Sequence, residues 1–98
     1  MVYLICYDIE SDRIRQRIGN KLIDWGLERI QYSVFIGEWS ETRKKQFDLW
    51  LLEKVKMDGK FDILQLPLSQ YSVTAAKHWG TNPPDWEYLQ GKKLSLIL

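Results

Sequence analysis

The feature that most constrains the fold is a short run of strand-forming residues that leads directly into a capped amphipathic helix. Residues 2–7 are apolar, mostly β-branched or aromatic, and too few for a helix, so they predict a buried central strand ending near Asp8. Ser11 stands where a helix N-cap is expected, and Gly26 where a helix ends. Between them, four apolar residues recur at helical spacing: Ile14, Ile18, Leu22 and Trp25.

The next segment alternates between apolar and polar side chains. This alternation over residues 29–39 predicts one long strand with a polar face. One face would carry Ile30, Tyr32, Val34 and Ile36. Ser33 and Phe35 would lie on the face turned away from the helices, which would be exposed in a monomer.

A second helix and a third strand follow. Ser40 is the expected N-cap of this helix, which ends before residue 58 and has the apolar stripe Phe47, Trp50, Leu51 and Val55. Residues 61–68 predict a strand in which Pro67 marks an edge or an end. Its inward-facing residues would be Leu64, Leu66 and Leu68.

The C-terminal third has a weaker pattern. Residues 71–79 are compatible with a helical turn and a fourth strand, residues 81–85 with an irregular linker, and residues 92–98 with a fifth strand. The element order predicts an α+β, ferredoxin-like βαββαβ sheet with both helices on one face. We therefore expect a ferredoxin-like domain in residues 1–80, followed by a linker and a C-terminal strand in residues 81–98.

The composition of the chain excludes several classes of function. The 98 residues include 14 Lys and Arg against 13 Asp and Glu, so any contact with nucleic acid must come from a local patch. The single cysteine, Cys6, excludes an intramolecular disulfide framework and a cysteine-rich zinc site. No apolar run approaches a membrane span and no signal peptide is recognisable, so a cytoplasmic protein without membrane contact is expected.

Asp8 is the most informative polar residue. It ends a buried strand beside Tyr7, where strands collect ligands, although capping of the following turn explains it about equally well. One carboxylate is a poor metal site in a monomer, but Mg²⁺ commonly takes one or two carboxylates and keeps several waters. A twofold homodimer would supply the second Asp8.

Basic residues flank this strand end on the first helix. Arg13, Arg17 and Lys21 form one stripe and Arg15 lies on the opposite shoulder, an arrangement suited to phosphates around a metal. A solvated helix face is the more common explanation of such a pattern. His78 and Cys6 have no companions at ligand spacing and are expected to be structural.

Three segments together resemble the Cas-two family of small CRISPR-associated nucleases of spacer acquisition. They are Tyr7-Asp8-Ile9, the Arg13-x-Arg15-x-Arg17 run, and residues 26–37. The Arg-x-Gln-Tyr-Ser-Val-Phe segment, from Arg29 to Phe35, is the specific part. The similarity is close over residues 2–37, follows element order to residue 68 and is looser beyond.

The resemblance implies a homodimer in which the C-terminal strand crosses to the partner's sheet. It implies Mg²⁺ shared by the two Asp8 side chains, cleavage of single-stranded RNA or duplex DNA, and assembly with the CRISPR integrase as a scaffold for DNA. By position, Asp8 and Tyr7 match catalytic residues. The positions matching substrate-binding residues are Arg13, Arg15, Arg17, Arg29 and Phe35. Ser11 departs from the family, which often has a second acid there.

Three alternatives stay open on the same fold. The first is a DNA-binding scaffold of the integration complex without turnover, which would also retain Asp8. The second is an RNA-recognition-like module that stacks bases on Tyr3, Tyr7 and Phe35, although the usual Lys-Gly-Phe-Gly-Phe string is missing. The third is a toxin-type ribonuclease.

Overall fold

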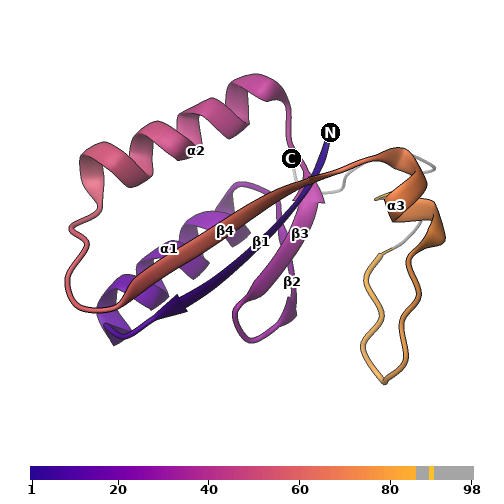
Figure 1. The fold of residues 1–98 in the computed structure, drawn as a ribbon, viewed down its shortest axis with the longest axis horizontal. Coiled ribbons are helices and arrows are strands. Elements are labelled where there is room, and N and C mark those ends of the chain that lie inside the picture. The colour runs from indigo at the N-terminus through magenta and orange to yellow at the C-terminus, as the bar shows by residue number, and fades with distance from the viewer. Residues whose placement is uncertain (86–88, 90–98) are drawn as a thin grey trace.

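The computed structural model describes residues 1–85 and Leu89. Within these residues, four strands and three helices follow one another (Figure 1). Their bounds are β1 Val2–Ile9, α1 Asp12–Asp24, β2 Glu28–Gln31, β3 Val34–Glu38, α2 Glu41–Lys54, β4 Phe61–Leu68 and α3 Gln70–Ala75.

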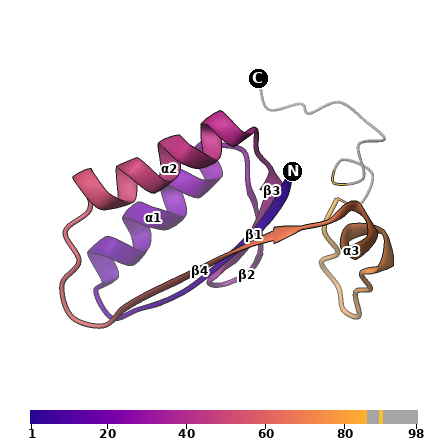
Figure 2. The ribbon, with the colours of Figure 1, turned by 45° about the horizontal axis from the view of Figure 1, so that its top comes forward.

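The strands form one antiparallel sheet in the order β2-β3-β1-β4. Helices α1 and α2 lie side by side on one face of this sheet (Figure 2). The βαββαβ order with both helices on one face is the ferredoxin-like arrangement predicted from the sequence. Strand β4 lies at the edge of the sheet, where a proline is tolerated, because the N–H that Pro67 lacks is not needed to pair two interior strands.

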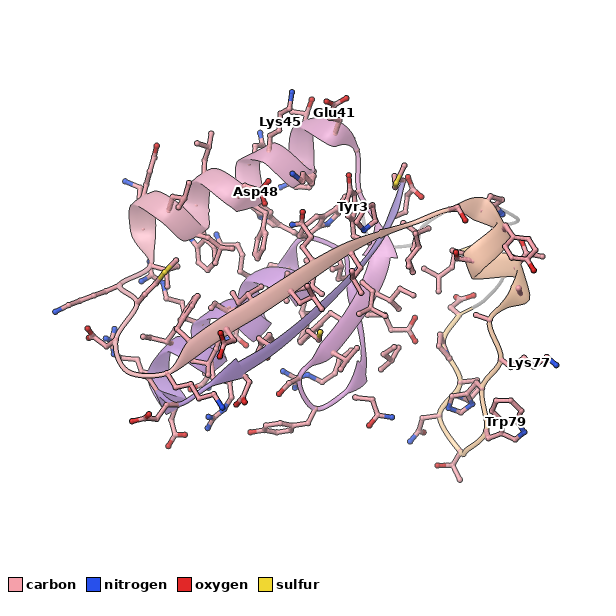
Figure 3. The ribbon with its side chains drawn as sticks, viewed as in Figure 1. Tyr3, Glu41, Lys45, Asp48, Lys77 and Trp79 are labelled. Carbon is pink, nitrogen blue, oxygen red and sulfur yellow. The ribbon has the colours of Figure 1, made fainter. Side chains whose placement is uncertain are left out.

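The helix ends follow the sequence signals. The hydroxyl oxygen of Ser11 accepts a hydrogen bond from the Ile14 N–H at 3.3 Å, and Ser40 caps α2 in the same way. Gly26 has a φ of 91°, a conformation that glycine adopts without strain, so the chain can leave α1 and enter β2. On the outer side of α2, Lys45 and Glu41 form an ion pair (Figure 3).

The main core lies between the helices and the sheet. Alternate residues of β1 point toward the helices because side chains alternate along a strand. The buried members of this core are Tyr3, Ile5, Tyr7, Ile9, Ile14, Ile18, Leu22, Leu27, Phe35, Trp39, Phe47 and Val55. The other face of the sheet, here called the open face, carries Leu4, Cys6 and Asp8 of β1. At one end of it, Val2 and Ile36 are covered by Val73 of α3 and by Leu89.

Residues 29–39 do not form one strand. The chain reverses at Tyr32 and Ser33, so β2 and β3 make a hairpin with an irregular register between Arg29 and Gln31. A reversal breaks the alternation that a single strand would keep. The prediction for Phe35 was therefore wrong: its side chain is fully buried in the main core.

The prediction of which β4 side chains point toward the core was also wrong. Leu64 and Leu66 lie on the open face and are exposed, whereas Phe61 and Ile63 pack against the main core. Both faces of this strand are apolar, so a period of two could not tell them apart. Beyond Leu68, the described residues contain α3 and no further strand, and residues 81–85 are irregular. The predicted strand over residues 92–98 lies outside the described residues.

No helix in the described part of the chain is both long and apolar enough to cross a membrane. Lys77 and Trp79 project from the segment after α3, far from the two-helix layer (Figure 3).

Candidate nucleic-acid interface

The end of β1 sends two neighbouring residues to opposite faces of the sheet. Tyr7 is buried beneath the helices, where its ring stacks on Phe35 with 6.0 Å between centroids. Its backbone N–H donates to the Ser33 carbonyl at 3.1 Å. Asp8 lies on the open face, and its side chain is 71% exposed. The two residues predicted to be catalytic therefore reach different surfaces.

Asp8 is surrounded by charged groups from β4 and the loop before it. Its Oδ2 lies 2.7 Å from Nζ of Lys60, and its cross-strand neighbour on β4 is Asp62. The Lys60 N–H in turn donates to Glu10 at 3.4 Å. The hydrogen bond and charge of Asp8 raise the pKa of Lys60 above its ordinary value, and Asp62 and Glu10 add smaller effects in the same direction. Lys60 is therefore positively charged beside Asp8 at neutral pH.

The chemistry of these donors fits Mg²⁺. Asp8 and Asp62 offer carboxylate oxygens, the ligands that Mg²⁺ prefers, and Asp8 is open to solvent. Within residues 1–85 and Leu89, no three side chains of the ligating types form a group that could hold a metal alone. If Mg²⁺ binds here, one chain would therefore offer carboxylate oxygens rather than a closed metal site.

A cleft opens on the helix side of the sheet, between α1 and the turn that joins β2 to β3. Its volume is about 340 Å³. It is lined by Tyr7, Asp12, Arg15, Gln16, Asn20, Arg29 and Tyr32. We call it the α1 cleft.

Two arginines stand in the α1 cleft. Nη1 of Arg15 donates to the Ile9 carbonyl at 2.8 Å and Nη2 pairs with Asp12, so this residue ties the start of α1 to the end of β1. The bond to Asp12 raises the pKa of Arg15 further. Arg29 stacks over Phe35, with 4.9 Å from Cζ to the ring centroid, and has no carboxylate partner among the described residues. One arginine is anchored, and the other has a free charge.

The remaining predicted arginines lie elsewhere. Arg17 stacks on Trp50 of α2 at 5.5 Å, and the Nζ of Lys21 lies between Trp25 and Trp50 at 4.9 and 4.8 Å. These contacts join α1 to α2 by cation–π attraction. Arg13 is exposed, and the described residues offer it no ion pair. The prediction that Arg15 lies on the opposite shoulder from Arg17 is confirmed.

The structure thus separates the predicted site residues. Tyr7, Arg15 and Arg29 meet at the α1 cleft, and Phe35 is buried beneath Arg29. Arg17 lies against α2, Asp8 lies on the open face, and Arg13 is exposed on α1. The sequence patterns did not mark five residues of these surfaces as functional: Tyr32, Gln16, Asn20, Lys60 and Asp62. The i,i+4 spacing of Gln16 and Asn20, one turn along α1, was the signal that could have revealed part of the cleft.

The fold and its arginine-lined cleft define a small ferredoxin-like α+β protein with groups suited to phosphate binding. A family model described as CRISPR associated protein Cas2 matches residues 1–75. The chain belongs to the Cas2 family, and its resemblance to that family in sequence is confirmed.

Relatives and a solved structure agree with this assignment. The chain is 47% identical over 76 residues to CRISPR-associated endoribonuclease Cas2 1 of Archaeoglobus fulgidus, covering 78% of this chain and 80% of the relative. It is 30% identical over 84 residues to CRISPR-associated endoribonuclease Cas2 2 of Pyrobaculum aerophilum, covering 86% and 91%. The crystal structure of Streptococcus pyogenes Cas2 at pH 6.5 has a TM-score of 0.67 at 18% identity, over 82% of this chain and all of that one, which supports the fold alone.

Proposed function

We propose that this protein is a Mg²⁺-dependent endonuclease of CRISPR adaptation, which cleaves phosphodiesters in single-stranded RNA or in duplex DNA. The observation that carries the proposal is the exposed Asp8 carboxylate at the end of the central strand, one residue from the α1 cleft. The names of the relatives, which are called endoribonucleases, support the reaction class.

The proposed working unit is a homodimer joined through the open face. Leu64 and Leu66 are 53% and 41% exposed there, on the edge strand β4, and two neighbouring exposed leucines favour a covering partner. A twofold axis through this face would bring two Asp8 side chains together, so that each dimer holds one Mg²⁺. We include in this proposal the exchange of residues 92–98 between protomers, so that residues 1–80 form the domain and 81–98 the connection.

Each part of the site has a role in the proposed reaction. Asp8 of each protomer would hold Mg²⁺, whose chemistry when bound is to polarise the phosphate and to make a bound water more acidic. Arg29 would bind a backbone phosphate through its unpaired guanidinium, and Arg15 would hold the end of β1 in place beside it. Tyr7 and Phe35 support Arg29 from below. Arg13 and Arg17 would contact phosphates further along the strand.

A non-catalytic scaffold is the second candidate. It is favoured by the Lys60 ammonium, which already neutralises Asp8. In this case the protein would hold DNA for the CRISPR integrase in the cytoplasm through the same arginines, without turnover. An RNA-recognition-like module is disfavoured, because Tyr3, Tyr7 and Phe35 point toward the helices and no aromatic ring lies on the open face of the four described strands.

A cleavage assay tests the proposal. Asp8→Asn should reduce Mg²⁺-dependent cleavage of labelled RNA or duplex DNA by about a hundredfold or more, because it removes both carboxylates of the shared site. Asp24→Asn, at the exposed end of α1, is the matched control and should cleave like the wild type. Residual Mg²⁺-dependent cleavage by purified Asp8→Asn would place the chemistry elsewhere. Absence of cleavage by the wild type, with intact DNA binding, would establish the scaffold instead.

A further inference from the structure

We propose that the α1 cleft is a binding site for one unpaired nucleotide of a single strand, and that Gly19 keeps the site open by leaving room for Arg29. This inference deepens the proposed function, since it rests on nucleic acid being the substrate. It assigns a ligand to Tyr32, Gln16 and Asn20, and it requires neither Asp8 nor Mg²⁺.

The phosphate subsite is the guanidinium of Arg29. It lies 4.9 Å above the ring of Phe35, and the described residues give it no carboxylate partner. Its planar group is therefore held by an aromatic surface while its N–H donors stay available. A guanidinium in this state suits a phosphate, which accepts two parallel hydrogen bonds.

The base subsite is the ring of Tyr32. This residue stands in the turn between β2 and β3 and is 72% exposed, although it lines the cleft. Arg29 approaches its ring with 5.9 Å between Cζ and the centroid. Most of the ring surface stays open, and an exposed aromatic ring beside a phosphate-binding cation is what stacks an unpaired base.

The side chains of Gln16 and Asn20 complete the cleft. They lie one turn apart on α1, and neither side chain has a hydrogen-bond partner among the described residues. Amide groups both donate and accept, so they match the edge of a base that is not engaged in pairing. The volume of about 340 Å³ is within the range of small-ligand sites.

Gly19 explains how Arg29 fits against α1. A Cβ at this buried position would lie 2.8 Å from Nη2 of Arg29 and 3.2 Å from the hydroxyl oxygen of Tyr7. Glycine is otherwise a poor choice for the middle of a helix. The closer atom is the far end of a flexible side chain, so alanine at this position would displace Arg29 and would require the Tyr7 hydroxyl to give by only a few tenths of an ångström. Gly19 is thus a positioning residue that acts through Arg29.

Binding can be measured without cleavage. The probe is a fluorescein-labelled single-stranded tetranucleotide, as RNA and as DNA. It is titrated with the 98-residue chain carrying Asp8→Asn in EDTA, with anisotropy as the readout. In this background Tyr32→Ala should weaken binding roughly tenfold, because one stacked base is lost. Tyr71→Ala is the matched control, since Tyr71 is an 80% exposed tyrosine on α3, away from the cleft. An abasic tetranucleotide should bind the wild-type cleft and the Tyr32→Ala cleft equally weakly.

Gly19→Ala gives a test in which stability and binding move in opposite directions. Unfolding in urea should show equal or higher stability, because alanine favours the helix. Binding of the tetranucleotide should nevertheless fall by about as much as in Arg29→Ala, and the double variant should bind no worse than Arg29→Ala alone, since both changes remove the same interaction. Loss of stability together with additive losses of binding would show a merely structural glycine and overturn its assigned role.

The outcomes separate this inference from the proposed function. Tetranucleotide binding that depends on Tyr32 and Arg29 supports the cleft even if the wild type never cleaves. Equal binding by Tyr32→Ala and Tyr71→Ala, or no binding by the starting protein, overturns the cleft even if Asp8 proves essential for cleavage. A preference for the RNA or the DNA probe would identify the source of the nucleotide.

Discussion

The two faces of the sheet differ in how completely their side chains are buried. On the helix-covered face, Tyr3, Ile5, Tyr7 and Phe35 are at most 8% exposed and belong to one core with aliphatic residues of α1 and Phe47 of α2. On the open face, β4 carries two leucines that are about half exposed, and a charged cluster surrounds Asp8 at the end of β1. The covered face therefore determines the fold, and the open face is the part of the sheet on which the proposed partner and metal would bind.

Truncation of the covered face should have the largest effect. Phe47→Ala removes a fully buried ring that contacts Trp25, Trp39 and Trp50, and should lower the free energy of unfolding by about 3–5 kcal/mol. Leu52→Ala is the control on the same helix, at a position 75% exposed, and should change it by no more than about 0.5 kcal/mol. Urea titration measures both. Equal losses would mean that the two positions are packed alike, against the structure.

Charge on the open face should act on assembly rather than on folding. Leu64→Asp should weaken the proposed dimer by about a hundredfold or more, because an unpaired carboxylate would be buried in the interface. Leu52→Asp places the same charge on the outside of α2 and should leave the dimer intact. Sedimentation velocity at a series of concentrations distinguishes the two variants. A Leu64→Asp protein that dimerises like the wild type would show that the open face is not the dimer interface.

The polar end of the open face should show the smallest effect. Lys60→Met removes the ammonium beside Asp8 and should tighten Mg²⁺ binding by up to about fivefold, the range expected for an exposed ion pair. The raised pKa of Lys60 keeps it charged at all pH values below the ordinary lysine range, so the gain should be the same from neutral to mildly alkaline pH. Isothermal titration measures it. Lys56→Met, which removes a partner of Asp58 instead, is the control. Weaker Mg²⁺ binding in Lys60→Met would mean that Lys60 assists the metal.

Local signals in the sequence were sufficient for the elements that they mark. Ser11, Ser40 and Gly26 begin or end helices where expected, since caps depend on the nearest few residues. The ferredoxin-like order followed from these elements. The turn at Tyr32 and Ser33 was not predicted because it contains neither glycine nor proline. The alternation of apolar and polar residues on both sides also concealed the reversal of the chain.

The sequence predicted several residues of the site, but it did not predict which of them lie together in the fold. Arg15 came from the basic pattern of the first helix, Tyr7 from its place beside Asp8, and Arg29 and Phe35 from resemblance to the family. Only the folded chain shows that Tyr7, Arg15 and Arg29 line one cleft, with Phe35 beneath Arg29. Which face of β4 is covered depends on its pairing with β1, which matches Asp62 with Asp8. Lys60 and Asp62 reach Asp8 through that long-range pairing, which no local pattern encodes.

The peptide that joins Tyr7 to Asp8 has a mechanical consequence. Strand β1 is hydrogen-bonded to β3 on one side and to β4 on the other, so its end is held by two neighbours. One rigid peptide unit thus sets the separation between a surface under the helices and a surface on the opposite side of the sheet. A change that shifts this unit must alter both surfaces together, whereas changes in the Tyr32 turn or in the loop carrying Lys60 can adjust one of them alone. Mutational variation in this protein is therefore freer in those two connections than at the end of its central strand.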